Sequence, residues 1–425
     1  MTRQVEQPLS TDSMAESLVS RPFTLKNGVE LPNRLVKAST AEGLADENFL
    51  PTEALIAAYR AWAEGGWGLV LTGNVQVDPR YLGQPTDIAY NEAVGYDTML
   101  ESWKKWAAAC SYNTSRTVVQ INHPGRQSPA GAGTRGFFAK SIAPSPVPLS
   151  LGKEFFPRLM STLIFGTPRE MTQQEIKEAV GRFASTARLA AEAGFAGVEL
   201  HAAHGYLLAQ FLSAKTNQRS DEYGGSAAAR AKIVVEVIQA VRAVVPRDFI
   251  VGIKLNSVDH QSATALGDGL LQLKLITDAG IDFLEVSGGT YEDPQLVAGT
   301  HTNTKKVTAK ERTREAFFLE FARTIRKELT GLPLIVTGGF RSRKVMEAAL
   351  QDDALDLIGM ARPAILNPSV PTNTILNTAV EEKDAKAYAR LIEPPWLLKK
   401  IGNVVIGAGA ETMWYGKQIA KMGKI

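Results

Sequence analysis

Short apolar runs alternate with amphipathic stretches along most of the chain. Within each run the apolar positions are largely continuous, which is typical of strands in a parallel sheet that is covered on both faces. Eight such runs occur, at Arg34–Thr40, Trp67–Asn74, Thr117–Asn122, Gly197–His201, Phe249–Asn256, Phe283–Gly288, Leu334–Gly339 and Leu355–Arg362. We therefore predict eight parallel strands.

The stretches between the runs have the period of amphipathic helices. In the stretch before the fourth strand, apolar residues recur at helical spacing at Ile176, Val180, Phe183, Ala187 and Ala190. This helix is predicted to begin at Thr172, whose spacing to Glu175 is that of a capping box, and to stop at Gly194. Eight strand–helix units without a dinucleotide-binding glycine fingerprint favour an α/β fold of the (β/α)8 TIM-barrel type over an open doubly wound sheet.

Three additions to the barrel are expected. Thr24–Leu31 is predicted to form a β-hairpin with a primed turn at Asn27–Gly28, and this N-terminal hairpin is expected to plug the barrel floor. The segment from His123 to about Met171 follows the third strand and is rich in Gly, Pro and Ser, which favours a long loop that acts as a lid or substrate wall. The predicted divisions are an N-terminal extension at 1–22, the barrel at 23–368 and a C-terminal extension at 369–425 packed on the barrel. Within that extension, Trp414 and Tyr415 are candidates for contacts in a homo-oligomer.

Composition narrows the class of protein. The 425 residues are 44% hydrophobic and 21% charged, as expected of a globular protein. The 47 basic and 44 acidic residues leave a net charge of +3, which is too balanced to indicate nucleic acid or a membrane surface as a partner. A single cysteine, Cys110, excludes a disulfide framework and a cysteine-bound iron–sulfur cluster. The sequence has neither a signal-peptide pattern nor an apolar stretch of membrane-spanning length, so we expect a soluble, cytoplasmic protein.

The ends of the last two predicted strands indicate a phosphate site. The seventh strand ends in Gly338 and Gly339 shortly before Arg341, and the eighth ends in Gly359 shortly before Arg362. Small residues let backbone N–H groups approach a phosphate closely, and barrels commonly bind phosphate in the loops after these two strands. A glycine that merely allows a turn explains one such end, but it explains two adjacent ends less well.

Two polar residues lie within strands that are otherwise apolar. Gln120 lies on the third strand and Lys254 on the fifth. A buried lysine has to be paired or face a ligand, so Lys254 either forms a salt bridge with Glu199 or Glu285 or contacts a bound molecule. Gln120 alone is equally consistent with a core amide. Together with a phosphate site, the two residues suggest a heterocycle whose carbonyls and ring nitrogens need donors.

The fourth strand runs directly into His201, His204 and Tyr206. Two imidazoles and a phenol at a strand tip can hold a carbonyl group and deliver a proton to it. A satisfied core histidine is the ordinary alternative, and the two histidines could also bind a metal, as in metal-dependent barrel aldolases or hydrolases. No further cluster of histidines or carboxylates is evident at another strand tip, so we predict no metal site.

These residues resemble the old yellow enzymes, a family of FMN-dependent ene-reductases and NADH:flavin oxidoreductases. The similarity runs from about Phe23 to Pro368. The motifs that carry it are NRLVKAST at 33–40, QINHPGRQS at 120–128, HAAHGYLLAQFLS at 201–213, NQRSDEYGGS at 217–226, TGGF at 337–340 and GMARP at 359–363.

The resemblance implies a role for each candidate residue. Ala38, Ser39, Thr40, Ala41, Gly73 and Gln120 would line the flavin. Lys254 would lie near N1 and the C2 carbonyl, where a cation favours the anionic reduced flavin. Gly338, Gly339, Ala361 and Arg362 would bind the phosphate. His201 and His204 would bind the substrate oxygen, and Tyr206 would donate the proton. Ala41 departs from the family, which usually has a threonine or cysteine here, so a lower redox potential of the flavin is expected unless Thr40 or Ser39 supplies the missing donor.

The activity implied by the resemblance is reduction of an activated alkene. NADPH or NADH would reduce FMN, which would pass hydride to the β-carbon of an α,β-unsaturated carbonyl compound or a similar small molecule, with Tyr206 protonating the α-carbon. The alternative is a flavin-dependent dehydrogenase that runs in the oxidative direction. A barrel that keeps flavin only as a structural or sensing ligand is the non-catalytic alternative.

Overall fold

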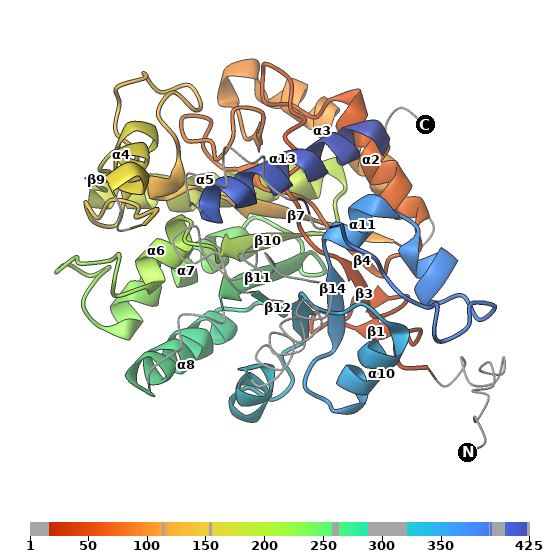
Figure 1. Cartoon of the computed structure of the whole chain (residues 1–425). Helices are drawn as coiled ribbons and strands as arrows, with labels where there is room; N and C mark the ends of the chain where they lie inside the picture. The colour runs from red at the N-terminus through yellow and green to blue at the C-terminus, as the bar shows by residue number, and fades with distance from the viewer. Residues whose placement is uncertain are drawn as a thin grey trace.

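The computed structural model describes residues 17–112, 115–152, 155–256, 263–287, 321–390, 392 and 404–422. Its centre is a barrel of parallel strands within a ring of helices (Figure 1). The barrel strands are β3 Leu35–Lys37, β4 Leu69–Leu71, β7 Arg116–Asn122, β10 Gly197–Ala202, β11 Ile250–Asn256, β12 Phe283–Ser287, β13 Leu334–Thr337 and β14 Leu357–Met360. Each lies within or almost within one of the predicted apolar runs.

The pairing of these strands closes the barrel. Each strand pairs with the next along the chain, β14 pairs with β3, and β7 pairs with β10, all in parallel. The predicted (β/α)8 barrel is therefore confirmed, and the open doubly wound sheet is excluded. Two short strands, β5 Val75–Gln76 and β6 Ile88–Ala89, extend the sheet beyond β7.

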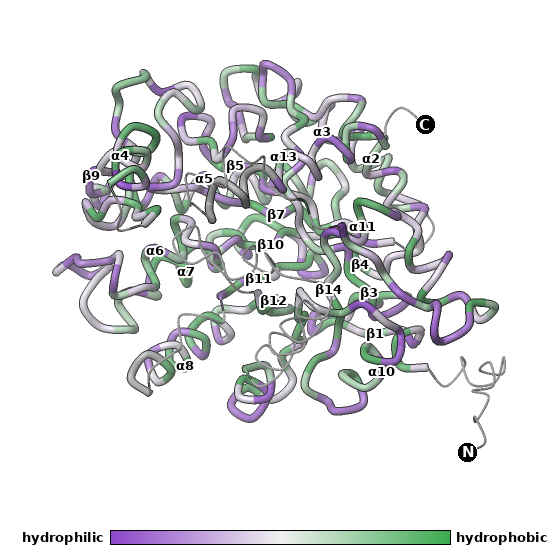
Figure 2. Tube along the Cα trace, viewed as in Figure 1, coloured by the Kyte–Doolittle hydropathy of each residue, from purple (hydrophilic) through white to green (hydrophobic). Residues whose placement is uncertain are grey.

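Helices cover the outside of the barrel. They are α2 Glu53–Glu64, α3 Tyr96–Cys110, α5 Gln173–Ala193, α7 Ala227–Arg242, α8 Ala263–Asp278, α10 Arg343–Gln351 and α11 Arg362–Leu366, with a further helical segment at 321–328 between β12 and β13. The strands in the centre are mostly apolar, and hydrophilic residues gather in the peripheral loops (Figure 2).

The local signals for α5 predict its ends correctly. Thr172 is the N-cap, its side chain accepts from the Glu175 amide, and the Glu175 side chain accepts from the Thr172 amide. These two hydrogen bonds form the predicted capping box. Gly194 ends the helix in the left-handed conformation with φ of 98°.

The N-terminal hairpin fills the floor of the barrel. It consists of β1 Phe23–Thr24 and β2 Glu30–Leu31. Leu25 and Leu31 are buried against inward-facing residues of the strands, namely Val36, Leu69, Leu71, Val118, Ile250, Phe283, Ile335 and Leu357. The predicted primed turn is wrong. The Leu25 amide donates to Val29 O and the Gly28 amide to Leu25 O, so Gly28, with φ of 87°, ends a three-residue loop instead.

Above this apolar floor, the inward-facing positions of several strands become polar. Side chains alternate along a strand, so the residues two positions after Val118, Phe283 and Ile335 also face the barrel axis. These residues are Gln120, Glu285 and Thr337. The same alternation places Glu199, His201 and Lys254 inside. The polar layer thus lies between the floor and the mouth of the barrel.

The segment after β7 contains short elements rather than a single open loop. They are η2 Gly125–Gln127, β8 Ile142–Ala143, α4 Phe155–Ile164 and β9 Arg169–Glu170. Arg219, from the loop before α7, donates to Pro144 O and Met171 O and so ties this segment to the barrel. Its service as a lid or substrate wall remains a prediction.

The C-terminal helix α13, Val404–Met422, contacts α2 and α11. Tyr415 is 4% exposed, and its hydroxyl accepts from Arg390 N and donates to Arg390 O. The expectation that Tyr415 reaches a neighbouring subunit is therefore wrong, because its ring and hydroxyl are buried within the same chain. Most of the N-terminal extension, residues 1–16, lies outside the described residues, and the three predicted domain boundaries remain predictions.

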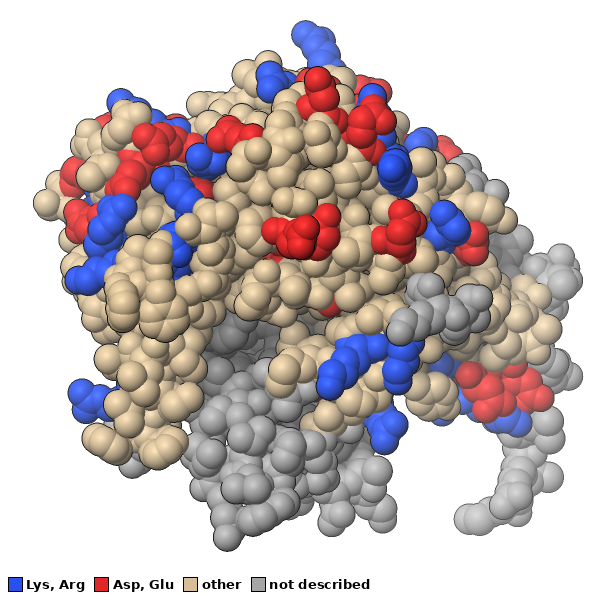
Figure 3. All heavy atoms as spheres, turned by 90° about the horizontal axis from the view of Figure 1, so that it is seen from above, with Lys and Arg blue, Asp and Glu red and all other residues tan. Residues whose placement is uncertain are grey.

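The surface carries both signs of charge. Seen from above, basic and acidic side chains are scattered among uncharged ones (Figure 3). Within the described part of the chain, none of the helices combines the length and the apolar character that a membrane span requires.

Candidate active site

His201 and Tyr206 meet at the tip of β10. His201 is one residue from the end of the strand, and Tyr206 is the N-cap of α6 Leu207–Leu212. Their rings lie edge to face with centroids 4.7 Å apart, and the ring of His204 lies 4.9 Å from that of His201. The three residues predicted from the sequence are thus brought together.

The backbone at His204 is held in an unusual conformation. Its φ of 56° is in the left-handed region, which is uncommon for residues other than glycine, although Asn, Asp and His adopt it more often than most. The His204 amide donates to Asn256 Oδ1 at 3.1 Å, and Gln127 Nε2 donates to the His204 carbonyl at 2.8 Å. Asn256 of β11 and Gln127 of η2 therefore stabilise a local strain, which is a common property of functional sites.

The two imidazoles form one directed chain of hydrogen bonds. The Ala203 amide donates to His201 Nδ1 at 3.4 Å, so the proton of a neutral His201 lies on Nε2. His201 Nε2 is 3.1 Å from His204 Nδ1, which must then accept. The proton of His204 is consequently on Nε2, 3.2 Å from Ser287 Oγ. Ser287, the last residue of β12, thereby becomes part of the site.

Both imidazoles are neutral at ordinary pH. Burial lowers the pKa of His201 well below its usual value, and the charges of His204 and Lys254 act in the same direction. Burial and the charge of Lys254 lower the pKa of His204 to about 3. As neutral rings they can donate one N–H bond each without carrying a charge.

Tyr206 has a polar neighbour on the adjacent wall of the barrel. Asn74, which follows β4, donates through Nδ2 to the Tyr206 oxygen at 3.4 Å. Because Asn74 is the donor, this bond orients the phenol without using its proton.

Gln120 and Lys254 lie in the polar layer near His201. Lys254 is opposite His201 in the strand register and donates to Glu285 Oε1 at 2.7 Å. Gln120 Nε2 donates to Glu199 Oε2 at 2.6 Å. The salt-bridge alternative for Lys254 is thus correct, with Glu285 as the partner, and it does not exclude a ligand on the other side of the ammonium group.

The ends of β3 and β4 contribute the next group of predicted residues. The Ala38 amide donates to Met360 O at 3.0 Å and so joins the ends of β3 and β14. A side chain at Gly73 would lie 2.4 Å from Thr40 O, so only glycine permits this contact between the two loops. Ala41, next to Thr40, is partly buried. These residues line one side of the barrel mouth.

The predicted phosphate residues also come together. Register pairing of Thr337 with Gly359 places Gly338 and Gly339 beside the end of β14, where Ala361 and Arg362 follow. Gly338 and Gly339 have φ of 126° and 87°, and such positive values leave their backbone in conformations that other residues rarely adopt. Arg362 Nη1 donates to Glu411 Oε1 of α13 at 3.0 Å.

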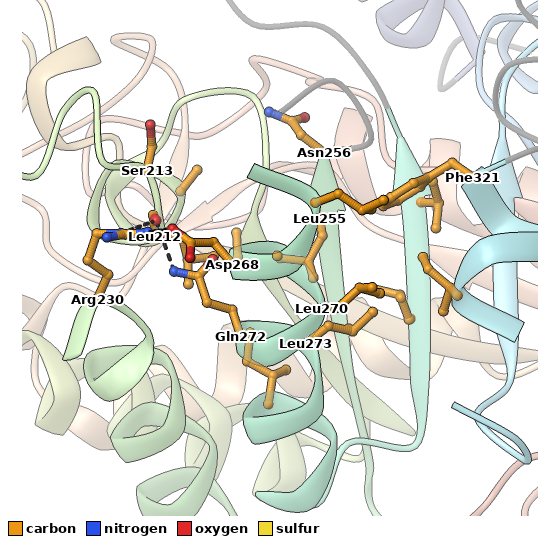
Figure 4. A pocket seen from close by; sticks show the side chains of 18 of the residues that line it. Leu212, Ser213, Arg230, Leu255, Asn256, Asp268, Leu270, Gln272, Leu273 and Phe321 are labelled. Carbon is orange, nitrogen blue, oxygen red and sulfur yellow. Dashed lines mark hydrogen bonds and ion pairs between the residues drawn. The ribbon is translucent and has the colours of Figure 1, made fainter. Parts of the chain in front are cut away.

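A cavity of about 150 Å³ lies between the helices α6, α7 and α8 and the outer side of the barrel, and it reaches Asn256 at the tip of β11 (Figure 4). Two further polar residues of its lining are paired with protein groups. Arg230 binds Asp268 at 2.6 Å, and Gln272 donates to Leu212 O and Ala227 O. The cavity therefore adjoins the site at Asn256, but the residues predicted for the site do not line it.

The comparison with protein families identifies the chain's class. Residues 19–378 match the model of the NADH:flavin oxidoreductase / NADH oxidase family. The chain belongs to this family. It is an NAD(P)H-dependent flavin oxidoreductase, and its cofactor is FMN.

Two fungal proteins illustrate the similarity within the flavin oxidoreductase family. The chain is 52% identical over 397 residues to the NADH-dependent flavin oxidoreductase iliE of Neonectria sp. (strain DH2), covering 92% of this chain and 52% of that protein. It therefore spans about half the length of this relative. It is 48% identical over 413 residues to the NADH-dependent flavin oxidoreductase iccE of Talaromyces variabilis, covering 97% of this chain and 99% of that protein.

A solved structure supports the fold. The old yellow enzyme homologue from Zymomonas mobilis superposes with a TM-score of 0.65 at 24% identity, covering 83% of this chain and 91% of that one. At this level of identity the likeness shows the barrel alone.

Unpartnered polar atoms at the barrel mouth fit a flavin. Among the described residues, Ser39 Oγ, Thr40 Oγ1, Asn74 Oδ1 and Asn256 Nδ2 are buried without a hydrogen-bond partner. Such groups are costly unless a ligand or water satisfies them. They lie at the ends of β3, β4 and β11, around the mouth, where a polar heterocycle could reach them.

A metal centre finds no support in the described part of the chain. No group of three or more His, Cys, Asp and Glu side chains there is arranged to hold an ion. His201 and His204 bind each other and Ser287 instead.

Sequence reasoning missed three polar residues of the site. Asn74, Asn256 and Ser287 each occur near the end of a predicted strand, which was the available signal. Side chains alternate along a strand, but this shows which of these three side chains face the barrel axis only once one inward-facing position of each strand is known.

His123, at the end of β7, gives the flavin oxidoreductase a pH-dependent stability. Burial lowers the pKa of His123 from 6.5 to about 4. The folded protein therefore binds fewer protons than the unfolded chain between these values, so stability falls as pH decreases through 6.5. We expect this residue to account for a loss of about 3 kcal/mol between pH 7 and pH 4.

Urea unfolding at several pH values measures this loss. In His123→Gln, the free energy of unfolding should fall less steeply between pH 6.5 and 4. The difference in slope should correspond to the uptake of about one proton on unfolding. Parallel curves for the two proteins would show that His123 titrates in the folded state as it does in the unfolded chain.

Proposed function

We propose that this flavin oxidoreductase is an ene-reductase for α,β-unsaturated carbonyl compounds or similar activated alkenes, with NADH or NADPH as the reductant. The observation that carries the proposal is the convergence of three side chains at a strand tip above the polar layer, where the ring of His201 lies within 5 Å of the rings of both His204 and Tyr206. Neutral N–H donors and a phenol in one place suit a substrate that develops negative charge on oxygen and needs a proton on carbon.

The residues around the mouth would hold FMN. Gln120 and Lys254 would face the pyrimidine edge of the ring, and Ala38, Ser39, Thr40, Ala41 and Gly73 would lie along the side formed by β3 and β4. The unpartnered hydroxyls of Ser39 and Thr40 are suited to replace the donor that Ala41 lacks. Gly338, Gly339, Ala361 and Arg362 would bind the phosphate, which backbone N–H groups and a guanidinium group recognise well.

The imidazole pair would bind and polarise the substrate oxygen. When bound, FMN supplies the hydride that it has received from NAD(P)H. His201 Nε2–H would donate to the oxygen on which enolate charge develops. For His204 to donate at the same point through Nδ1, its proton would move from Nε2, and Ser287 Oγ would then donate to Nε2 instead of accepting.

Tyr206 would protonate the α-carbon. A phenol keeps its proton at neutral pH, so it remains an acid until a stronger carbon base forms. The hydrogen bond from Asn74 to the phenol oxygen would hold the ring in place and would stabilise the phenolate after the proton has left.

The proposal is tested by a two-step anaerobic titration of the FMN-loaded protein. NADH or NADPH should bleach the flavin absorbance, and cyclohexenone should then restore it. Cyclohexanone, which has the same ring but no activated alkene, is the control and should leave the protein bleached. A bleached protein that cyclohexenone does not recolour would refute the ene-reductase assignment, and bleaching by a saturated ketone alone would favour the oxidative direction.

A further inference from the structure

Three ionisable side chains lie side by side inside the barrel. Glu199 of β10, Lys254 of β11 and Glu285 of β12 come from consecutive strands of the sheet. Both glutamates are 0% exposed and Lys254 is 3% exposed. Burying three such groups is costly unless their charges and hydrogen bonds are matched closely.

Lys254 and Glu285 form a direct ion pair. They are opposite each other in the parallel register, so their side chains point to the same face of the sheet. Lys254 Nζ lies 2.7 Å from Glu285 Oε1. One positive and one negative charge of this group therefore offset each other.

Glu199 has no cationic partner of its own among the described residues. Its Oε2 accepts from Gln120 Nε2 at 2.6 Å, and its Oε1 has no hydrogen-bond partner. Lys254, the neighbouring cation, is paired with Glu285 instead. Because a buried carboxylate without a partner cation is costly when it is ionised, Glu199 is expected to be a neutral acid.

The proton belongs to Glu199. Burial and the charge of Glu285 raise the pKa of Glu199 well above its usual value, and Lys254 only partly opposes this. Burial acts to raise the pKa of Glu285 as well, but the charge of Lys254, which lies 2.7 Å away, outweighs it and lowers the pKa. The group therefore consists of a cation, an anion and a neutral acid.

The same residues hold both groups that would face the pyrimidine edge of FMN. Glu199 binds Gln120, and Glu285 binds Lys254. Reduction adds negative charge to a flavin, and a nearby cation favours the reduced form. A carboxylate paired with that cation reduces this preference, because its own charge acts against the reduced flavin.

We propose that Glu285 and Glu199 are positioning residues that set the reduction potential of FMN. Glu285 offsets the charge of Lys254 and keeps the potential low. Glu199, as the neutral acid, accepts from Gln120 and holds it in place without adding a charge beside the ion pair. This inference rests on the proposed placement of FMN against Gln120 and Lys254, but it does not depend on the substrate.

Two isosteric substitutions separate the roles of the carboxyl groups. Glu285→Gln removes the negative charge and leaves Lys254 uncompensated, so the midpoint potential of bound FMN should shift to more positive values. Glu199→Gln replaces a neutral acid by a neutral amide that can still accept from Gln120. It should leave the potential nearly unchanged and is the matched control.

Equilibration of the FMN-loaded variants with redox dyes under anaerobic conditions gives the potentials. An unchanged potential in Glu285→Gln, or an equal shift in both variants, would overturn the proposal.

If Glu285→Gln fails to fold, the infrared spectra of native protein and Glu199→Gln decide whether Glu199 is the neutral acid. Only the native protein should show the carbonyl band of the acid at Glu199, and its absence from the difference spectrum at neutral pH would refute the assignment.

These outcomes are distinguishable from failure of the proposed function. A protein that does not reduce cyclohexenone can still show the potential shift, and an active ene-reductase can lack it.

Discussion

Replacement of Tyr206 by phenylalanine should slow alkene reduction by about 10²–10⁴, the range expected when a general acid is lost. The phenylalanine ring preserves the edge-to-face packing on His201, whose centroid lies 4.7 Å from that of Tyr206. Only the hydroxyl is removed, so substrate binding and flavin reduction by NADH or NADPH should remain close to those of the native protein. Stopped-flow absorbance of the two half-reactions gives both rates separately.

Asn74→Ala provides a second variant for this test. It removes the hydrogen bond to the phenol oxygen but keeps the acid itself, so its effect on alkene reduction should be smaller than that of Tyr206→Phe. If Tyr206→Phe slowed both half-reactions equally, the hydroxyl would act in a common step such as flavin positioning, and the proton-donor role would be wrong.

Removal of the imidazole at position 204 should lower alkene reduction by about 10²–10³, as expected for loss of one preorganised donor to a developing oxyanion. The substitution has to respect the backbone, since φ at His204 is 56°. His204→Gly removes the donor and accepts this conformation without strain. His204→Asn also tolerates it and keeps an N–H donor.

The comparison of these two variants separates the effect of losing the N–H donor at position 204 from any effect on the stability of the fold. We expect kcat/KM for cyclohexenone to fall strongly in His204→Gly and much less in His204→Asn, while thermal unfolding temperatures of the two remain similar. Equal activities would show that the donor at this position does not stabilise the transition state.

Much of the fold could be predicted because its signals are local. Continuous apolar runs located all eight barrel strands, and the capping box at Thr172 with Gly194 gave both ends of α5. The ends of the strands were predicted less accurately. The predicted run Trp67–Asn74 is longer than the strand β4 inside it, which covers only Leu69–Leu71. The strand stops early because the Gly73 amide donates to Glu42 Oε1 rather than to a neighbouring strand. The hairpin turn was wrong because the register of β1 and β2 adds a third loop residue around Gly28.

The site was predictable in its residue types but not in its contacts. The run from His201 to Tyr206 placed three functional groups at one strand tip. The choice between Glu199 and Glu285 as the partner of Lys254 depended on the register of β11 and β12, which sequence does not give. The hydrogen bond from His204 to Ser287 joins residues 83 positions apart, and no local pattern predicts such a contact.

The unpartnered hydroxyls of Ser39 and Thr40 also bear on how the newly made chain folds and matures. A ligand that binds only the native state stabilises it in proportion to the logarithm of the ligand concentration. FMN that satisfies these hydroxyls would therefore act during maturation as well as during turnover. Cells short of riboflavin would accumulate less native protein, and producing hosts would give better yields when the vitamin is supplied during synthesis.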